Sequence, residues 1–144
     1  MNEDFGGPYL QTAVFCENVI EGKDGVLSLI RIIDRTTITA TGPGAPEKMP
    51  PTTINAHMVL TFKSGFAKGS FAVKIKPQAP DGSRLPDVTV PMHLEGDDRG
   101  QNIILRIGMV GDQEGVYWFD VMLGDSLVTR MPFRLVYQRL ALGG

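Results

Sequence analysis

The chain has 144 residues, 42% of them hydrophobic and 21% charged, which is typical of a globular domain and excludes a disordered or fibrous chain. Its formal net charge of −2 argues against nucleic-acid binding, because the basic stripe that neutralises a phosphate backbone is missing. No apolar run approaches the ~20 residues of a membrane helix, and the acidic N-terminus has no secretory signal. The one cysteine fits a reducing compartment. We therefore expect a cytoplasmic protein without a membrane partner.

Short runs of alternating hydrophobicity, separated by glycines and prolines, predict an all-β fold. The first run covers residues 10–20 and ends at a turn around Asp24-Gly25. The second run, residues 26–40, is apolar on both faces, which predicts either a central strand or a strand that changes sheets at a bend. Residues 41–53 then hold four prolines and two glycines and form the longest predicted loop.

The second half of the chain keeps the period of two. Apolar and polar positions alternate in residues 54–64. A glycine-rich segment is expected to link this run to the next one, residues 70–76. A second glycine-rich segment is expected to link residues 88–94 to residues 103–109. Pro91 cannot donate a ladder hydrogen bond, so it predicts an edge strand or a bulge. The last two runs, residues 116–123 and 127–137, are expected to form a hairpin across Gly124-Asp125-Ser126.

About eight strands of this kind predict an antiparallel two-sheet β-sandwich. The inward aliphatic and aromatic side chains would fill the space of about 10 Å between the sheets. We expect a single domain at residues 10–137, with an N-terminal arm at residues 1–9 and a flexible C-terminal tail at residues 138–144.

Two stretches of the chain carry a family resemblance. One is the opening hairpin, with Phe15-Cys16-Glu17-Asn18, residues 25–30 and Asp34-Arg35; the other comprises residues 115–119, 124–127 and 132–136. Together they resemble a family of short, uncharacterised bacterial proteins, a domain of unknown function with an immunoglobulin-like β-sandwich. The resemblance covers roughly residues 10–137. It implies the fold and implies no activity.

Catalytic chemistry has three candidate residues, His57, His93 and Cys16. A nucleophile needs a base within hydrogen-bond reach, and neither histidine lies in a motif that supplies one. Both histidines occupy outward positions of predicted strands, where a solvated surface histidine is the simpler interpretation. Cys16 lies on an apolar strand, where we expect a buried, unreactive thiol. We therefore expect no enzymatic activity and assign no catalytic residue.

Acidic residues in the loops raise the alternative of a calcium-binding or other ligand-binding sandwich, since calcium takes roughly six to eight oxygen ligands. The candidates are Glu95, Asp97, Asp98, Asp81 and Asp112. Their spacing matches no EF-hand, and aspartate is common in turns for conformational reasons. A zinc site would have one cysteine and two histidines to draw on. We therefore assign no metal ligand and no cofactor.

One exposed aromatic residue and one loop are the predicted partner-binding surfaces. Trp118 lies on the opposite strand face from Tyr117 and Phe119, so it either covers the second face of its sheet or anchors a partner. The lysines Lys63, Lys74 and Lys76 could form a basic face, although exposed lysines usually serve to prevent aggregation. The predicted contact residues are Trp118, Met122, Pro43, Pro46 and Pro50.

The C-terminal segment supports a different hypothesis. Arg139, Leu140 and Leu142 precede Gly143-Gly144, and this segment resembles the end of ubiquitin, where a strand runs out into leucine, arginine and two glycines. The resemblance implies conjugation through Gly144 by activating and conjugating enzymes. The segment departs from ubiquitin because Leu142 stands where ubiquitin has an arginine, and residues 34–58 supply no amphipathic helix.

Taken together, the sequence favours a non-enzymatic protein-binding or adaptor module of a bacterial cytoplasmic system. Its protein partner is not identified by the sequence, and self-association through an edge strand is a further expectation. The alternatives are a ubiquitin-like modifier conjugated through its C-terminal diglycine and a ligand- or calcium-binding β-sandwich.

Overall fold

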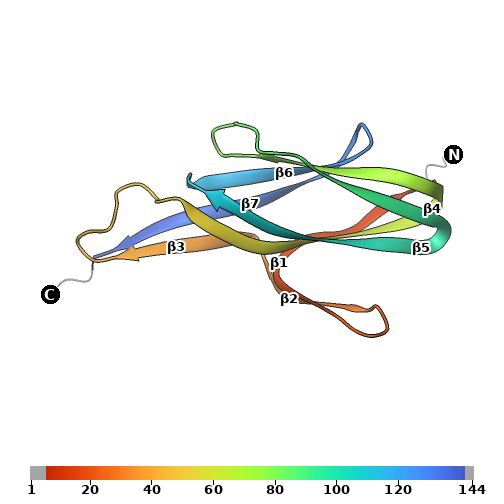
Figure 1. The fold of residues 1–144 in the computed structure, drawn as a ribbon, viewed down its shortest axis with the longest axis horizontal. Coiled ribbons are helices and arrows are strands. Elements are labelled where there is room, and N and C mark those ends of the chain that lie inside the picture. Colours follow the sequence, from red (N-terminus) through yellow and green to blue (C-terminus); the bar gives the residue numbers. More distant parts are fainter. Residues whose placement is uncertain (1–5, 142–144) are drawn as a thin grey trace.

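The computed structural model describes residues 6–141, and within this range the chain forms seven β-strands (Figure 1). The strands are β1 (Tyr9–Glu21), β2 (Leu27–Ile33), β3 (Arg35–Thr41), β4 (Thr52–Gln78), β5 (Val88–Gly111), β6 (Gly115–Leu123) and β7 (Ser126–Leu140). In the same range, no helix has the length and apolar character needed to cross a membrane. The predicted all-β class is confirmed, with one strand fewer than expected.

The strands form one mixed sheet in the order β2-β1-β4-β6-β7-β3, and β5 pairs with β4 outside this path. The pairs are antiparallel except for β3 and β7, which run parallel from Arg35 opposite Arg134 to Thr41 opposite Leu140. This arrangement differs from the predicted antiparallel pairing in two separate sheets. The two halves stay connected because β4 pairs with β1 through its first half and with β6 through its second half.

Strands β4 and β5 are long because the glycine-rich segments expected to separate shorter strands are bulges within a continuous ladder. The ladder runs from Thr52 opposite Gly111 to Ile75 opposite Val88, with register shifts at Lys63/Gly65 and Gly65/Lys68. Residues at this level have the positive φ angles that favour glycine and are tolerated by aspartate: Gly65 at 60°, Gly69 at 111°, Gly96 at 97° and Asp97 at 58°. The paired strands therefore bend together, at one end of the molecule (Figure 1).

The apolar run at residues 26–40 is divided by a bend, as one of its two predicted alternatives expected, but the strands on either side belong to one sheet instead of two. Strand β2 pairs with β1, whereas β3 pairs with β7. The break lies at Asp34, whose carbonyl oxygen accepts a hydrogen bond from the Arg134 amide at 2.9 Å. Asp34 therefore connects β2 and β3, which are the first and last strands of the strand order.

An aromatic cluster joins the two halves of the sheet. The ring of Phe15 on β1 lies edge-on to Phe119 on β6 and to Phe133 on β7, with centroid distances of 5.2 and 5.1 Å. The predicted inward positions of the first half of β4 fill the same core and are all buried: Ile54, Ala56, Met58, Leu60 and Phe62. The alternation predicted for this strand is confirmed.

Strand β7 continues beyond the predicted domain boundary. Gln138, Arg139 and Leu140 pair with residues 39–41 of β3, so the first part of the predicted flexible tail belongs to the sheet. The sequence missed this extension because its partner strand is remote in the chain. At the other end, the Gly6 carbonyl accepts a hydrogen bond from the Phe66 amide at 2.7 Å, so part of the predicted arm contacts the β4–β5 bend.

Candidate partner-binding face

The outward side of strands β4, β6, β7 and β3 carries Trp118 among basic side chains. Gln78 and Pro132 lie directly opposite Trp118, and Asp120 lies between Lys76 and Arg130. Residues directly opposite each other on neighbouring strands share one side of the sheet. We call this surface the Trp118 face and define it by Lys74, Lys76, Trp118, Met122, Arg130, Arg134 and Arg35.

The indole of Trp118 is partly covered and partly open to solvent. The residue is 40% exposed. It lines a shallow depression of about 260 Å³ together with Asp34, Arg35, Val116, Pro132 and Arg134. A large amphipathic side chain held in a depression with a polar rim is the arrangement found at interface hot spots.

Positive charge dominates the Trp118 face. Asp120 is largely covered, and its Oδ1 lies 3.1 Å from Nε of Arg130, while Nε of Arg35 donates to Asp34 at 3.1 Å. By contrast, three further basic residues form no ion pair with a carboxylate of residues 6–141: Lys74, Lys76 and Arg134. Within the part of the chain that the structure describes, the face therefore presents three unpaired cations around an exposed aromatic ring.

Lys63 does not belong to this face, although the sequence grouped it with Lys74 and Lys76. It lies opposite Gly100, next to the β4–β5 bulges. There it lines a separate polar depression with His93 and Glu95. The sequence grouping expected residues 65–69 to link two neighbouring strands, whereas β4 runs on through them, so Lys63 lies 11 residues before Lys74 on the same strand.

The loop between β3 and β4, residues 42–51, is tied to the sheet. The Tyr137 hydroxyl donates to the Pro46 carbonyl at 2.6 Å, the Gly42 amide donates to the Leu140 carbonyl at 2.9 Å, and Met49 is buried in the core. The predicted contact prolines are exposed: Pro43, Pro46 and Pro50. The loop lies at the end of the molecule where β7 ends (Figure 1), and the depression around Trp118 includes none of these prolines.

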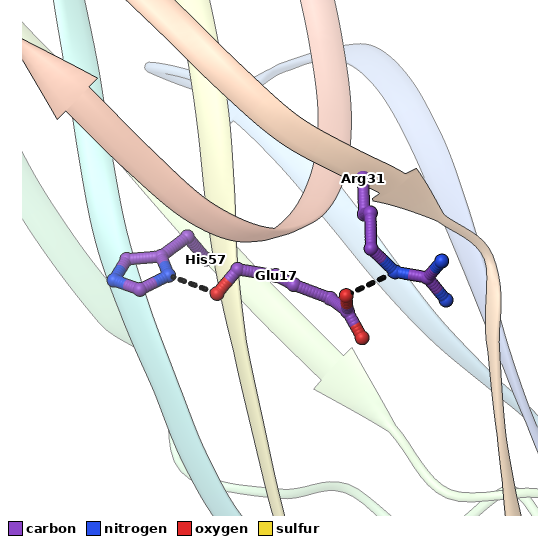
Figure 2. A network of polar contacts seen from close by, with 3 residues as sticks. All are labelled: Glu17, Arg31 and His57. Atoms are coloured by element: carbon purple, nitrogen blue, oxygen red, sulfur yellow. Dashed lines mark hydrogen bonds and ion pairs between the residues drawn. The ribbon is translucent and has the colours of Figure 1, made fainter.

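A second polar group joins β1, β2 and β4 (Figure 2). Nδ1 of His57 lies 3.3 Å from the backbone oxygen of Glu17, whereas the Glu17 carboxylate accepts a hydrogen bond from Nε of Arg31. Arg31 has a φ of 55°, which is uncommon for a residue other than glycine. Because the carboxylate faces Arg31 and the imidazole faces a main-chain carbonyl, Glu17 and His57 do not form an acid–base pair.

The structure places a histidine beside Cys16 that sequence order did not reveal. His57 lies directly opposite Cys16 in the β1–β4 ladder, and adjacent strand positions separated by 41 residues give no signal in the sequence. The expected burial of Cys16 is confirmed, and this burial raises the pKa of its thiol. A thiol with a raised pKa stays protonated near neutral pH and is a poor nucleophile.

Cys16 is expected to resist alkylation while the protein is folded. At pH 8, iodoacetamide should modify it ~100-fold more slowly in buffer than in 8 M urea, as followed by intact-mass spectrometry. The variant Ser28→Cys adds an exposed thiol on β2 as an internal control, which should react rapidly in the same molecule. Equal labelling rates for the two thiols would contradict the burial of Cys16.

The acidic candidates for a calcium site do not converge on one point, and two of them have other partners. Asp81 accepts hydrogen bonds from the Ser83 hydroxyl at 2.6 Å and from Gln113 Nε2 at 3.3 Å, and the Ser83 bond lowers the pKa of this carboxyl. Glu95 pairs with Arg99 at 2.6 Å. The remaining candidates are exposed: Asp97, Asp98 and Asp112. Over residues 6–141, no three acidic, histidine or cysteine side chains form a group that could hold a metal ion.

The residues predicted to form a conjugation tail fall into two sets. Arg139 and Leu140 are part of β7, opposite Ala40 and Thr41 of β3. Three of the predicted tail residues lie outside the described residues: Leu142, Gly143 and Gly144. The first two residues of the predicted conjugation tail, Arg139 and Leu140, are therefore paired strand residues.

Comparison with known proteins adds the family of the chain. An immunoglobulin-like protein from Pseudomonas aeruginosa, solved at 1.50 Å, is similar in structure with a TM-score of 0.45 and 14% sequence identity, over 92% of this chain and 99% of that one. No curated protein matches the sequence. Residues 11–136 match the family of unknown function DUF6941, and the chain belongs to this family.

Proposed function

We propose that this chain is a non-enzymatic protein-binding module and that the Trp118 face is its contact surface. The observation that carries the proposal is the 40% exposure of Trp118 on a hydrogen-bonded sheet, with Arg134 and Met122 on the same side. Tryptophan, methionine and arginine are the residue types enriched in protein interfaces. A side chain presented by a rigid strand also loses less conformational freedom on binding than one presented by a loop.

We also propose that the one bent sheet packs against itself in two layers, in an immunoglobulin-like arrangement. Contacts of Phe15 with both Phe119 and Phe133 support it, because they join β1 to β6 and β7 across the core. A reducing cytoplasmic setting is part of the proposal, since the one cysteine of the chain is a buried free thiol.

Site-specific crosslinking in the native host tests the proposed function. A photoreactive phenylalanine analogue at Met122 is expected to give a discrete covalent adduct with another protein, identified by mass spectrometry. The same analogue at Phe66, which is 79% exposed at the β4–β5 bend, should not give that adduct. Crosslinks of equal yield at both positions, or no adduct from Met122, would reject the Trp118 face as the contact surface.

The variant Trp118→Ala is expected to reduce the Met122 adduct at least tenfold, because truncation of an interface hot spot costs about 2 kcal/mol or more. Its thermal unfolding should stay close to that of the parent, since surface substitutions usually change stability by about 0.5 kcal/mol or less. An undiminished adduct from a folded Trp118→Ala protein would show that Trp118 does not anchor the partner.

A further inference from the structure

We infer that the segment recognised by the Trp118 face is an acidic, carboxylate-bearing stretch of protein. This inference rests on the proposed function and specifies the chemistry of the partner. Its basis is the pattern of charge around the indole. Trp118 lies opposite Gln78 and Pro132, and residues two positions from these on the neighbouring strands are Lys76, Arg130 and Arg134. Such diagonal neighbours lie about 7–8 Å away, within reach of long side chains.

The concentration of positive charge is local rather than a property of the whole chain. The chain has 14 basic and 16 acidic residues, yet this face gathers five basic side chains: Lys74, Lys76, Arg130, Arg134 and Arg35. Two of the five are neutralised by Asp120 and Asp34. Lys74, Lys76 and Arg134 have no such partner among residues 6–141 and are available to a carboxylate from outside.

A protein segment fits these groups better than a nucleic acid does. Single-stranded nucleic acids bind along rows of aromatic side chains, whereas Trp118 is the one tryptophan of the chain and its strand neighbours on this face are Val116 and Asp120. Asp120 lies in the middle of the face, where it would oppose a continuous line of phosphates. The net charge of −2 also gives no long-range attraction to a polyanion. Separated carboxylates flanking an apolar residue would avoid Asp120 and still reach Lys74, Lys76 and Arg134.

Fluorescence of Trp118 reports binding directly, because the chain has no other tryptophan. The probe is a capped peptide in which glutamates flank a leucine, compared with the same peptide carrying glutamine and with an oligothymidylate of equal charge. The glutamate peptide should change the emission saturably, bind at least tenfold more tightly than the glutamine peptide, and weaken as salt is raised from 50 to 500 mM. Equal binding of the two peptides would overturn the inference, and tighter binding of the oligonucleotide would replace it with a nucleic-acid surface.

Charge reversal separates this inference from the proposed function. Arg134→Glu and Lys74→Glu should each weaken the peptide about tenfold, whereas Lys68→Glu at the bend makes the same change in net charge and should leave binding unchanged. In cells, Arg134→Glu should diminish the Met122 adduct, and Lys68→Glu should not. An adduct that forms normally in Arg134→Glu would retain the proposed function and reject an acidic partner. An absent adduct in the parent protein would reject the proposed function itself.

Discussion

The variant Phe15→Ala is expected to unfold with a free energy about 3–5 kcal/mol lower than that of the parent, as large-to-small substitutions of buried aromatic residues generally do. Phe15 is 4% exposed and contacts Phe119 and Phe133 at centroid distances of 5.2 and 5.1 Å. Its removal would leave a cavity where β1 packs against β6 and β7. Since small domains are stable by only about 5–15 kcal/mol, this loss should be easily measured by urea denaturation followed by circular dichroism.

Phe66→Ala is the matched control for this measurement. It deletes the same side chain from a position that is 79% exposed, so the free energy of unfolding should change by about 0.5 kcal/mol or less. If Phe15→Ala were no more destabilising than Phe66→Ala, the contact of β1 with β6 and β7 would not contribute to stability. In that case the two halves of the sheet would be held together mainly by their shared strand β4.

Local patterns predicted the parts of the fold that depend on neighbouring residues. The closing hairpin is present between β6 and β7, and Gly124 has the positive φ of 58° that its tight turn requires. Pro91 was expected at an edge or a bulge, and in the described part of the chain β5 pairs with β4 alone. The side-chain alternation of residues 54–62 was also read correctly, because burial on one face of a strand repeats every two residues.

The sequence could not distinguish a bulge from a turn. A positive φ at Gly65, Gly69 and Gly96 suits a bulge as well as a turn. Whether such a glycine forms a bulge depends on whether the partner strand bends at the same level. The parallel pairing of β3 with β7 is equally hidden, because it joins Arg35 to Arg134 across most of the chain. The extension of β7 to Leu140 follows from that pairing, so it was missed together with it.

The candidate site was predictable in its centre and not in its surroundings. The alternation of β6 places Trp118 and Met122 opposite Tyr117 and Phe119, and the structure agrees. The cations around Trp118 come from three other strands, and only the pairing of those strands brings Lys76, Arg134 and Arg35 to one surface. The sequence therefore predicted the outward position of Trp118, and it grouped Lys63 with Lys74 and Lys76 although Lys63 lies elsewhere on β4.

The second large effect is expected for Gly100→Ala, which should destabilise the protein by about 1–3 kcal/mol or more through overpacking. Gly100 lies opposite Lys63, next to the bulges within the β4–β5 ladder. A Cβ atom there would lie 1.9 Å from the Phe62 carbonyl oxygen and 3.0 Å from Cδ of Lys63. A backbone oxygen cannot rotate away as a flexible side chain can, so β4 and β5 would have to separate locally.

Gly108→Ala is the control on the same strand, and it should not lower the free energy of unfolding. A Cβ atom at this position would meet the Asn55 side-chain oxygen at 3.7 Å, an ordinary contact. Because glycine within a strand costs roughly 0.5–1 kcal/mol relative to alanine, Gly108→Ala is expected to be neutral or slightly stabilising in urea denaturation. Equal stability of the two variants would mean that β4 and β5 do not approach closely at Gly100. The pairing of Gly100 with Lys63, and with it the bend between Lys63 and the Trp118 face, would then be wrong.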